Sequence, residues 1–273
     1  MLTSHQLPSL IMIANPCGTD GAVSGMAVHA DEEPKAENMT RPMEAGEYVA
    51  VSPAGGMCSL RIERVEPHAN KFSLAPEALP SSGLTEETLA KYNRPVWRTV
   101  LQMTEPSQDV RETVIFATRV AQRLAALGDG IVMDTCAYRF FGPEGWPVQE
   151  PLPDFDAREH VHVHLESDSN WLHTHGLIKF GRPELEIYDV PPELHYAAFE
   201  MLLNTAQYVI TSTIITPKQT CGDPDQPFYA REGTRNREGH WNDLAVLELV
   251  DLDERRKPIP SGAPKALQLF AAS

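Results

Sequence analysis

The chain has 273 residues, 42% of them hydrophobic, so it can bury one large core or two smaller ones, and we expect two packed lobes. Its formal charge of −15 at pH 7, from 38 acidic against 23 basic residues, opposes contact with nucleic-acid phosphates or an anionic membrane surface. We therefore expect neither nucleic acid nor a membrane among its partners.

The start of the chain lacks a positively charged segment, and its apolar run is too short for a signal peptide or a membrane span. The four cysteines are far apart and include no C-x-x-C pair. These two observations predict a cytoplasmic protein with reduced thiols.

Residues 1–92 are expected to form an irregular, β-containing N-terminal region. Residues 15–45 are rich in turn-forming and polar residues and carry no apolar period, which indicates loop. Residues 47–52 and 59–66 are short alternating runs separated by Pro-Ala-Gly-Gly-Met, a pattern typical of a hairpin. A short helix is predicted over residues 85–91.

Residues 93–273 are expected to form an α+β domain, beginning with a strand, a helix and a second strand. Strand-like alternation over residues 96–103 precedes a helix over 107–127 and a buried strand over 129–135. The helix carries apolar residues at helical spacing: Val110, Val114, Ala117, Ala121 and Leu124. This β-α-β unit resembles one half of a ferredoxin-like sandwich, so we expect helices on one face of a mainly antiparallel sheet.

The same kind of pattern continues to the end of the chain. Strands are predicted over residues 160–166, 171–178 and 184–189, and a helix is predicted to start near Pro191 and Pro192. A further strand is predicted over 208–215, and after a polar, loop-like segment the last one spans 244–250.

Five of the ten histidines lie within residues 159–175, so this segment is the candidate functional site. Strand periodicity places His160, His162, His164 and Glu166 on one face of the first strand. Trp171, His173 and His175 share a face of the second strand. A two- or four-residue turn between the strands would place His164 opposite His173 and His162 opposite His175.

Four imidazoles in this register would have Cβ atoms roughly 5 Å apart across the strands, close enough to converge on a tetrahedral zinc ion. The alternative is that the imidazoles hydrogen-bond one another, water or carboxylates without a metal. Three carboxylates are possible ligands or supports: Glu159, Glu166 and Asp168. His195 is expected on a helix surface.

The stretch from Trp171 to Tyr188 resembles a core segment of uncharacterised bacterial domain families, in which Thr-x-Gly-Leu precedes Phe-Gly-x-Pro-Glu-Leu-Glu. The resemblance implies membership of a domain family of unknown function and carries no activity. Gly176 and Gly181 are placed where the backbone must turn sharply before the next strand.

The same stretch also resembles the JAMM zinc isopeptidase motif, in which a His-Ser/Thr-His pair and a downstream Asp bind zinc while an upstream Glu activates water. His173-Thr174-His175 matches the pair. Glu186 stands where the family has its Asp, and Pro183 stands where the family has a Ser. The activating glutamate is open between Glu144, Glu150 and Glu159.

The candidate metal set is thus His162, His164, His173, His175 and Glu186, with two alternatives open: zinc as the cofactor, or no cofactor. The leading functional interpretation is binding of a protein or small-molecule partner. The alternative is a zinc-dependent hydrolase of the JAMM type.

Overall fold

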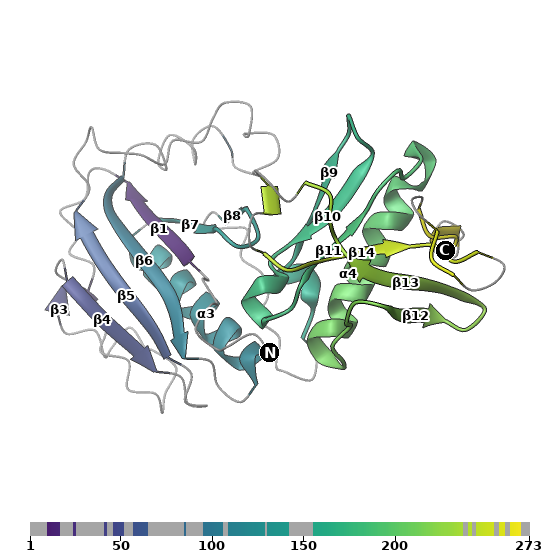
Figure 1. Ribbon diagram of the computed structural model, residues 1–273. Coiled ribbons are helices and arrows are strands. Elements are labelled where there is room, and N and C mark those ends of the chain that lie inside the picture. Colours follow the sequence, from purple (N-terminus) through teal and green to yellow (C-terminus); the bar gives the residue numbers. More distant parts are fainter. Residues whose placement is uncertain are drawn as a thin grey trace. The chain divides into compact units, whose positions relative to one another are not determined.

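The computed structural model describes residues 10–16, 24–25, 41–42, 46–51, 57–64, 85, 95–105, 109–128, 130–141, 155–236, 240–241, 244–253, 257–259 and 263–268. The chain divides into two compact units, Met1–Pro153 and Asp154–Ser273 (Figure 1). The sequence predicts a division after residue 92, and that division stays a prediction.

The first unit contains a six-stranded sheet in the order β4-β5-β6-β1-β7-β8, in which every neighbouring pair is antiparallel. Its strands are β1 (Leu10–Pro16), β4 (Gly46–Val51), β5 (Met57–Arg64), β6 (Pro95–Glu105), β7 (Ile131–Asp134) and β8 (Arg139–Phe141). A separate short pair joins β2 (Ser24–Gly25) to β3 (Arg41–Pro42). The predicted hairpin is confirmed as β4–β5.

Helix α3 (Val110–Gly128) packs on this sheet through β1, β6 and β7. Four residues of its predicted apolar stripe are buried: Val114, Ala117, Ala121 and Leu124. Because β6 and β7 are both antiparallel to β1, they run parallel to each other, with α3 as their connection. The predicted order of strand, helix and buried strand is therefore confirmed, and the ferredoxin-like assignment stays a prediction.

The second unit contains another six-stranded sheet, in the order β12-β13-β14-β11-β10-β9, with β11 and β14 parallel and the other pairs antiparallel (Figure 1). Its strands are β9 (His162–Glu166), β10 (Trp171–His175), β11 (Glu184–Ile187), β12 (Gln219–Asp223), β13 (Gln226–Glu232) and β14 (Val246–Val250). Short 3-10 helices also occur among the described residues: η4 (Ala157–Glu159) precedes β9, η5 (Leu177–Phe180) follows β10, and η6 (Pro192–Leu194) follows β11.

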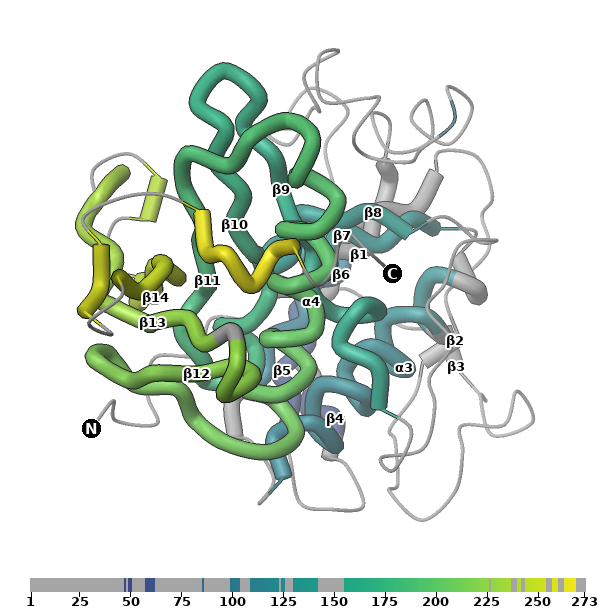
Figure 2. Tube along the Cα trace, turned by 90° about the vertical axis from the view of Figure 1, so that its right-hand side faces the viewer, coloured from purple at the N-terminus to yellow at the C-terminus, as the bar shows by residue number. Residues whose placement is uncertain are grey.

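Helix α4 (His195–Thr211) packs against β9, β10 and β11 (Figure 2). Its buried side includes Met201, Leu202, Val209 and Ile210. The strand predicted over residues 208–215 is wrong. Helix α4 continues to Thr211, and the β-branched residues Val209 and Ile210 pack as part of its apolar face.

The α+β class with mostly antiparallel sheets is confirmed for the described residues. β1 lies inside the first sheet although the sequence predicted loop from residue 15, and the hairpin β12–β13 lies in a segment for which no strand was predicted. Apart from Thr85, the helix predicted over residues 85–91 lies outside the described residues. Among the helices that the structure describes, none combines the length and apolar character needed to cross a bilayer.

Candidate metal centre

The hairpin β9–β10 has the register that the sequence predicts. His164 pairs with His173, His162 with His175, and Glu166 with Trp171, through a four-residue turn over residues 167–170. Asn170, at the end of this turn, adopts a positive φ of 48°, a conformation that asparagine tolerates better than most residues. The prediction that four imidazoles share one face of an antiparallel hairpin is confirmed.

Two of these histidines lie inside the protein. The side chain of His173 is 0% exposed and that of His175 is 8% exposed. Their Nε2 atoms are 3.0 Å apart, although the residues are two positions apart on one strand. Two imidazole nitrogens bound to one zinc, each about 2.0–2.1 Å from it, are separated by a similar distance.

His240 joins this pair from a distant part of the chain. One ring nitrogen from each of His173, His175 and His240 forms a group whose atoms all lie within 4.8 Å of one another. The ring centroid of His240 lies 4.6 Å from that of His173 and 5.4 Å from that of His175. Sequence analysis missed His240, because it sits in a polar segment without strand periodicity. Its only local signal is the neighbouring Trp241.

Nε2 of His173 and Nε2 of His175 lie within hydrogen-bonding distance of each other, whereas two other ring nitrogens of the group have no partner. Nδ1 of His173 and Nε2 of His240 are buried and have no hydrogen-bond partner. Buried polar atoms normally have such a partner, and their absence requires a physical reason. A metal ion would provide a partner for a nitrogen that faces it.

The electrostatic surroundings keep the three imidazoles neutral. Burial, followed by repulsion from neighbouring imidazolium charges, lowers the pKa of His173 to about 2 and that of His175 to about 3. Burial also lowers the pKa of His240, which the charge of Glu166 partly offsets. Neutral imidazole is the form that binds a metal ion, so these histidines are ready to coordinate one at pH 7.

His162 and His164 lie beside this group without belonging to it. The ring of His164 is 5.4 Å from that of His173, and the ring of His162 is 6.3 Å from that of His164. Nε2 of His164 is 3.3 Å from Oε1 of Glu166, and the two side chains are partly exposed, at 40% and 46%. The two histidines of β9 therefore border the outer side of the site.

Glu186 pairs with His173 across β10 and β11 but does not belong to the group either. Its Oε2 accepts hydrogen bonds from the hydroxyl of Tyr188, at 2.8 Å, and from the indole N–H of Trp241, at 2.9 Å. Its Oε1 is buried without a partner. Burial raises the pKa of Glu186 to about 7, while these two donors act in the opposite direction.

Aromatic rings surround the buried side of the three histidines. The ring of Trp171 lies 3.9 Å from that of His173, and Trp241 lies 5.3 Å from it. Tyr188 stacks on Trp171 with a centroid distance of 5.4 Å. This shell excludes water from the inner nitrogens and lowers the local dielectric, which strengthens interactions between a cation and its ligands.

The remaining histidines that the sequence singled out serve the fold. His160 precedes β9 and stacks on Phe155, with ring centroids 5.1 Å apart. His195 begins α4, half-buried, and its Nε2 lies 3.1 Å from the carbonyl oxygen of Val190. Asp168 is exposed in the turn of the hairpin.

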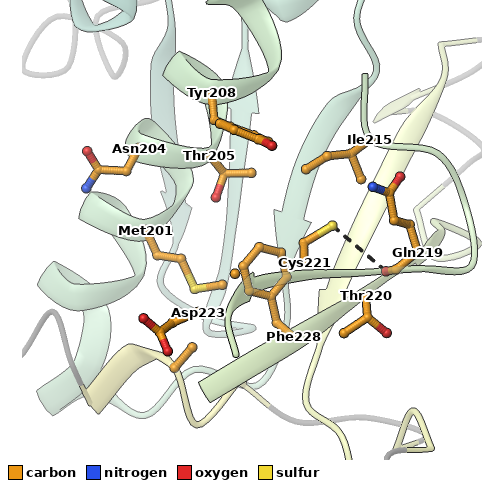
Figure 3. A pocket seen from close by; sticks show the side chains of 12 residues that line it. Met201, Asn204, Thr205, Tyr208, Ile215, Gln219, Thr220, Cys221, Asp223 and Phe228 are labelled. Atoms are coloured by element: carbon orange, nitrogen blue, oxygen red, sulfur yellow. Dashed lines mark hydrogen bonds between the residues drawn. The ribbon is translucent and has the colours of Figure 1, made fainter. Parts of the chain in front are cut away.

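A separate cavity of about 490 Å³ lies between α4 and the hairpin β12–β13 (Figure 3). Met201, Ile215 and Phe228 supply apolar lining, and Asn204 and Asp223 lie among the polar residues around it. The thiol of Cys221 also lines it, and burial raises the pKa of this thiol, so it is not a reactive thiolate.

Comparison with known proteins adds one finding. Residues 160–232 match the family model described as "Protein of unknown function (DUF4026) C-terminal". This segment is similar to the DUF4026 C-terminal domain. The match confirms the predicted relation to an uncharacterised domain family. The DUF4026-like segment includes β9, β10 and β11, and it ends before His240. No curated protein and no solved structure matches the chain.

Proposed function

We propose that the second unit binds one divalent transition-metal ion, zinc by preference, through His173, His175 and His240. The observation that carries this proposal is the convergence of three ring nitrogens within 4.8 Å from two segments far apart in the sequence. The depressed pKa values of all three groups and the unpartnered, buried Nε2 of His240 support it.

The chemistry of the donor set favours zinc over harder cations. Imidazole nitrogens suit zinc, copper, nickel and iron, whereas magnesium and calcium prefer oxygen ligands. Three protein ligands leave a fourth tetrahedral position for water or an added ligand. His162, His164 and Glu166 border the site on its accessible side, so a ligand entering there would contact polar groups.

The proposed role in the cell is binding rather than a named reaction. A cytoplasmic protein that presents a zinc ion with one exchangeable position could hold an anionic small molecule or a side chain of a protein partner. The similarity to a family of unknown function is compatible with this role.

Metal titration of the full chain tests the proposal. After removal of metal with a chelator, calorimetry with zinc should give about one ion per chain, and elemental analysis of the reconstituted protein should agree. His173→Ala and His240→Ala should each abolish stoichiometric binding. His195→Ala is the matched control, because His195 contacts a backbone carbonyl outside the group, and it should bind like the wild type.

The outcomes separate the possibilities. Absence of binding by the wild type contradicts the metal proposal. Equal binding by His240→Ala and the wild type contradicts the three-histidine set and leaves the hairpin histidines as the site.

A zinc-dependent hydrolase is the second candidate, favoured by the open fourth position of a three-histidine set. A JAMM-type set would require Glu186 as a ligand; its Oε2 accepts from Tyr188 and Trp241, and its Oε1 has no hydrogen-bond partner. The test is cleavage of an isopeptide-linked peptide by the zinc-loaded chain. Turnover that disappears in His173→Ala supports the hydrolase, and zinc binding without turnover favours the binding role.

A further inference from the structure

We propose that Glu186 is a positioning residue that fixes His240 at the metal centre by anchoring Trp241. This inference rests on the proposed metal function and gives Glu186 a different part in it from the ligand role expected from the sequence. The observation behind it is a chain of direct contacts that links the strand next to the histidine pair to the distant segment with the third histidine.

The sheet register provides the first link. Glu186 on β11 lies directly opposite His173 on β10, so both side chains stand on the same face of the sheet. β11 is an interior strand, bonded to β10 on one side and to β14 on the other. Glu186 is 0% exposed and therefore has a fixed position relative to the histidine pair.

The buried hydrogen bond from Trp241 provides the second link. The indole N–H of Trp241 donates to Oε2 of Glu186 at 2.9 Å, and the Trp241 side chain is 0% exposed. Because His240 precedes Trp241 directly in the chain, anchoring the indole restricts the backbone that carries the imidazole. Loss of this hydrogen bond would leave the buried indole N–H without a partner, which is unfavourable.

The close fit of the backbone around Glu186 provides the third link. A Cβ atom added at Gly233 would lie 2.4 Å from Oε1 of Glu186 and 2.6 Å from Cγ1 of Val246. The backbone at Gly233 therefore limits movement of the carboxylate on one side. Tyr188 holds the same carboxylate through Oε2.

These contacts assign Glu186 to the layer of groups that orients metal ligands. Such outer groups commonly change metal affinity by about 10- to 100-fold when they are removed. Here Glu186 holds Trp241, and Trp241 in turn orients the neighbouring His240.

The test combines three variants of the full chain with copper(II) as the probe metal, because electron paramagnetic resonance counts the imidazoles bound to copper. Glu186→Ala removes the acceptor, Trp241→Phe removes only the indole and its donor, and Glu186→Gln retains an amide oxygen that can accept. Tyr188→Phe is the matched control, because it removes the other donor to the same oxygen and leaves the indole bond.

Glu186→Ala and Trp241→Phe should lose one coordinated imidazole and bind copper about 10- to 100-fold more weakly. Glu186→Gln and Tyr188→Phe should keep three imidazoles. Three coordinated imidazoles in both Glu186→Ala and Trp241→Phe would overturn the inference while leaving metal binding intact.

A second measurement uses the metal-free protein and does not depend on the proposed function. In the wild type and in Glu186→Gln, the indole N–H of Trp241 should be protected from hydrogen exchange. In folded Glu186→Ala its protection should be lost and the imidazole resonances of His240 should shift. An equally protected indole and unshifted resonances in Glu186→Ala would overturn the inference even if the wild type bound no metal.

Discussion

The burial of His173 is unusual for a titratable side chain and indicates a candidate functional residue. An imidazole that is 0% exposed and surrounded by other imidazoles is costly to protonate in the folded state. Its buried Nδ1 also lacks a hydrogen-bond partner, which is a second unfavourable feature of the metal-free protein.

The lowered pKa values make the stability of the metal-free protein depend on pH. The unfolded chain protonates His173 and His175 below about pH 6.5, whereas the folded pKa values are about 2 and about 3. The unfolded state therefore binds more protons as the pH falls from 6.5, and each histidine lowers the free energy of unfolding by about 1.4 kcal/mol per pH unit.

Glu184 and Glu186 act in the opposite direction over part of this range. Burial raises the pKa of each from about 4.5 to about 7, so the folded state binds more protons between these values. Their contribution to stability grows as the pH falls from 7 to 4.5, and it is lost as the pH rises through 7. Below about pH 4.5 these carboxyls are protonated in both the folded and the unfolded state. Only the histidines then continue to lower the free energy of unfolding as the pH falls.

We predict that the stability advantage of the metal-free wild type over metal-free His173→Ala shrinks below pH 6.5 by about 1.4 kcal/mol per pH unit. The comparison cancels the two glutamates, since both proteins contain them. Urea unfolding of both proteins between pH 7 and pH 4, in the presence of chelator, measures the difference. Parallel stability curves for the two proteins would show that His173 is not held neutral by the fold.

Among the elements, α3 offers the simplest relation between pattern and packing. Its apolar stripe recurs at helical spacing, and the stripe is buried against the sheet of the first unit. The same spacing over residues 197–210 also describes α4, yet the run Val209-Ile210-Thr211 has high β-propensity by itself. Burial of Val209 and Ile210 on the apolar face of α4 favours helix over strand for this run, and that burial is visible only in the folded chain.

We predict that Leu124→Ala on α3 lowers the free energy of unfolding by about 2–5 kcal/mol, because Leu124 is 6% exposed and truncation leaves a cavity. Arg119→Ala on the exposed side of the same helix is the control and should change stability by less than about 0.5 kcal/mol. Urea titration followed by circular dichroism measures both. Equal stability of the two variants would place the stripe outside the core.

The hairpin β9–β10 could be predicted in detail, and the third histidine of the candidate centre could not. The alternation of side chains along each strand and the length of the turn at residues 167–170 determine which residues oppose each other. Local sequence is therefore sufficient to predict that His164 pairs with His173. His240 lies 54 residues beyond Glu186 in the chain, in the segment before β14, which pairs in parallel with β11. The indole N–H of the next residue, Trp241, donates to Glu186. Long-range pairing of that kind leaves no local pattern in a single sequence.

At the scale of the whole molecule, every residue of the candidate metal centre belongs to one of the two compact units. His173, His175, His240 and the anchoring pair Glu186 and Trp241 all lie within Asp154–Ser273. This unit also has its own sheet, its own helix and a buried core that includes Leu172, Leu185 and Leu202. These are the properties expected of a segment that folds by itself.

We predict that residues 154–273, expressed alone, fold cooperatively and bind zinc with an affinity within about threefold of the full chain, a difference below about 0.7 kcal/mol. Circular dichroism melting and calorimetric titration check the two parts of this prediction. A folded fragment that fails to bind, beside a full chain that binds, would mean that the first unit contributes to the site. An unfolded fragment would show that the second unit depends on the first for stability.

The parallel pairing of β11 with β14 has a consequence for the order in which the site is assembled. The hairpin β9–β10 joins neighbours in the chain and can close early, whereas β14 must wait until α4, β12 and β13 have been accommodated between it and β11. A folding chain would thus present a two-histidine chelate before the third imidazole arrives. Under the proposed zinc function, zinc added during refolding would bind weakly to this pair at first and tightly only in the final step, as a slow second kinetic phase.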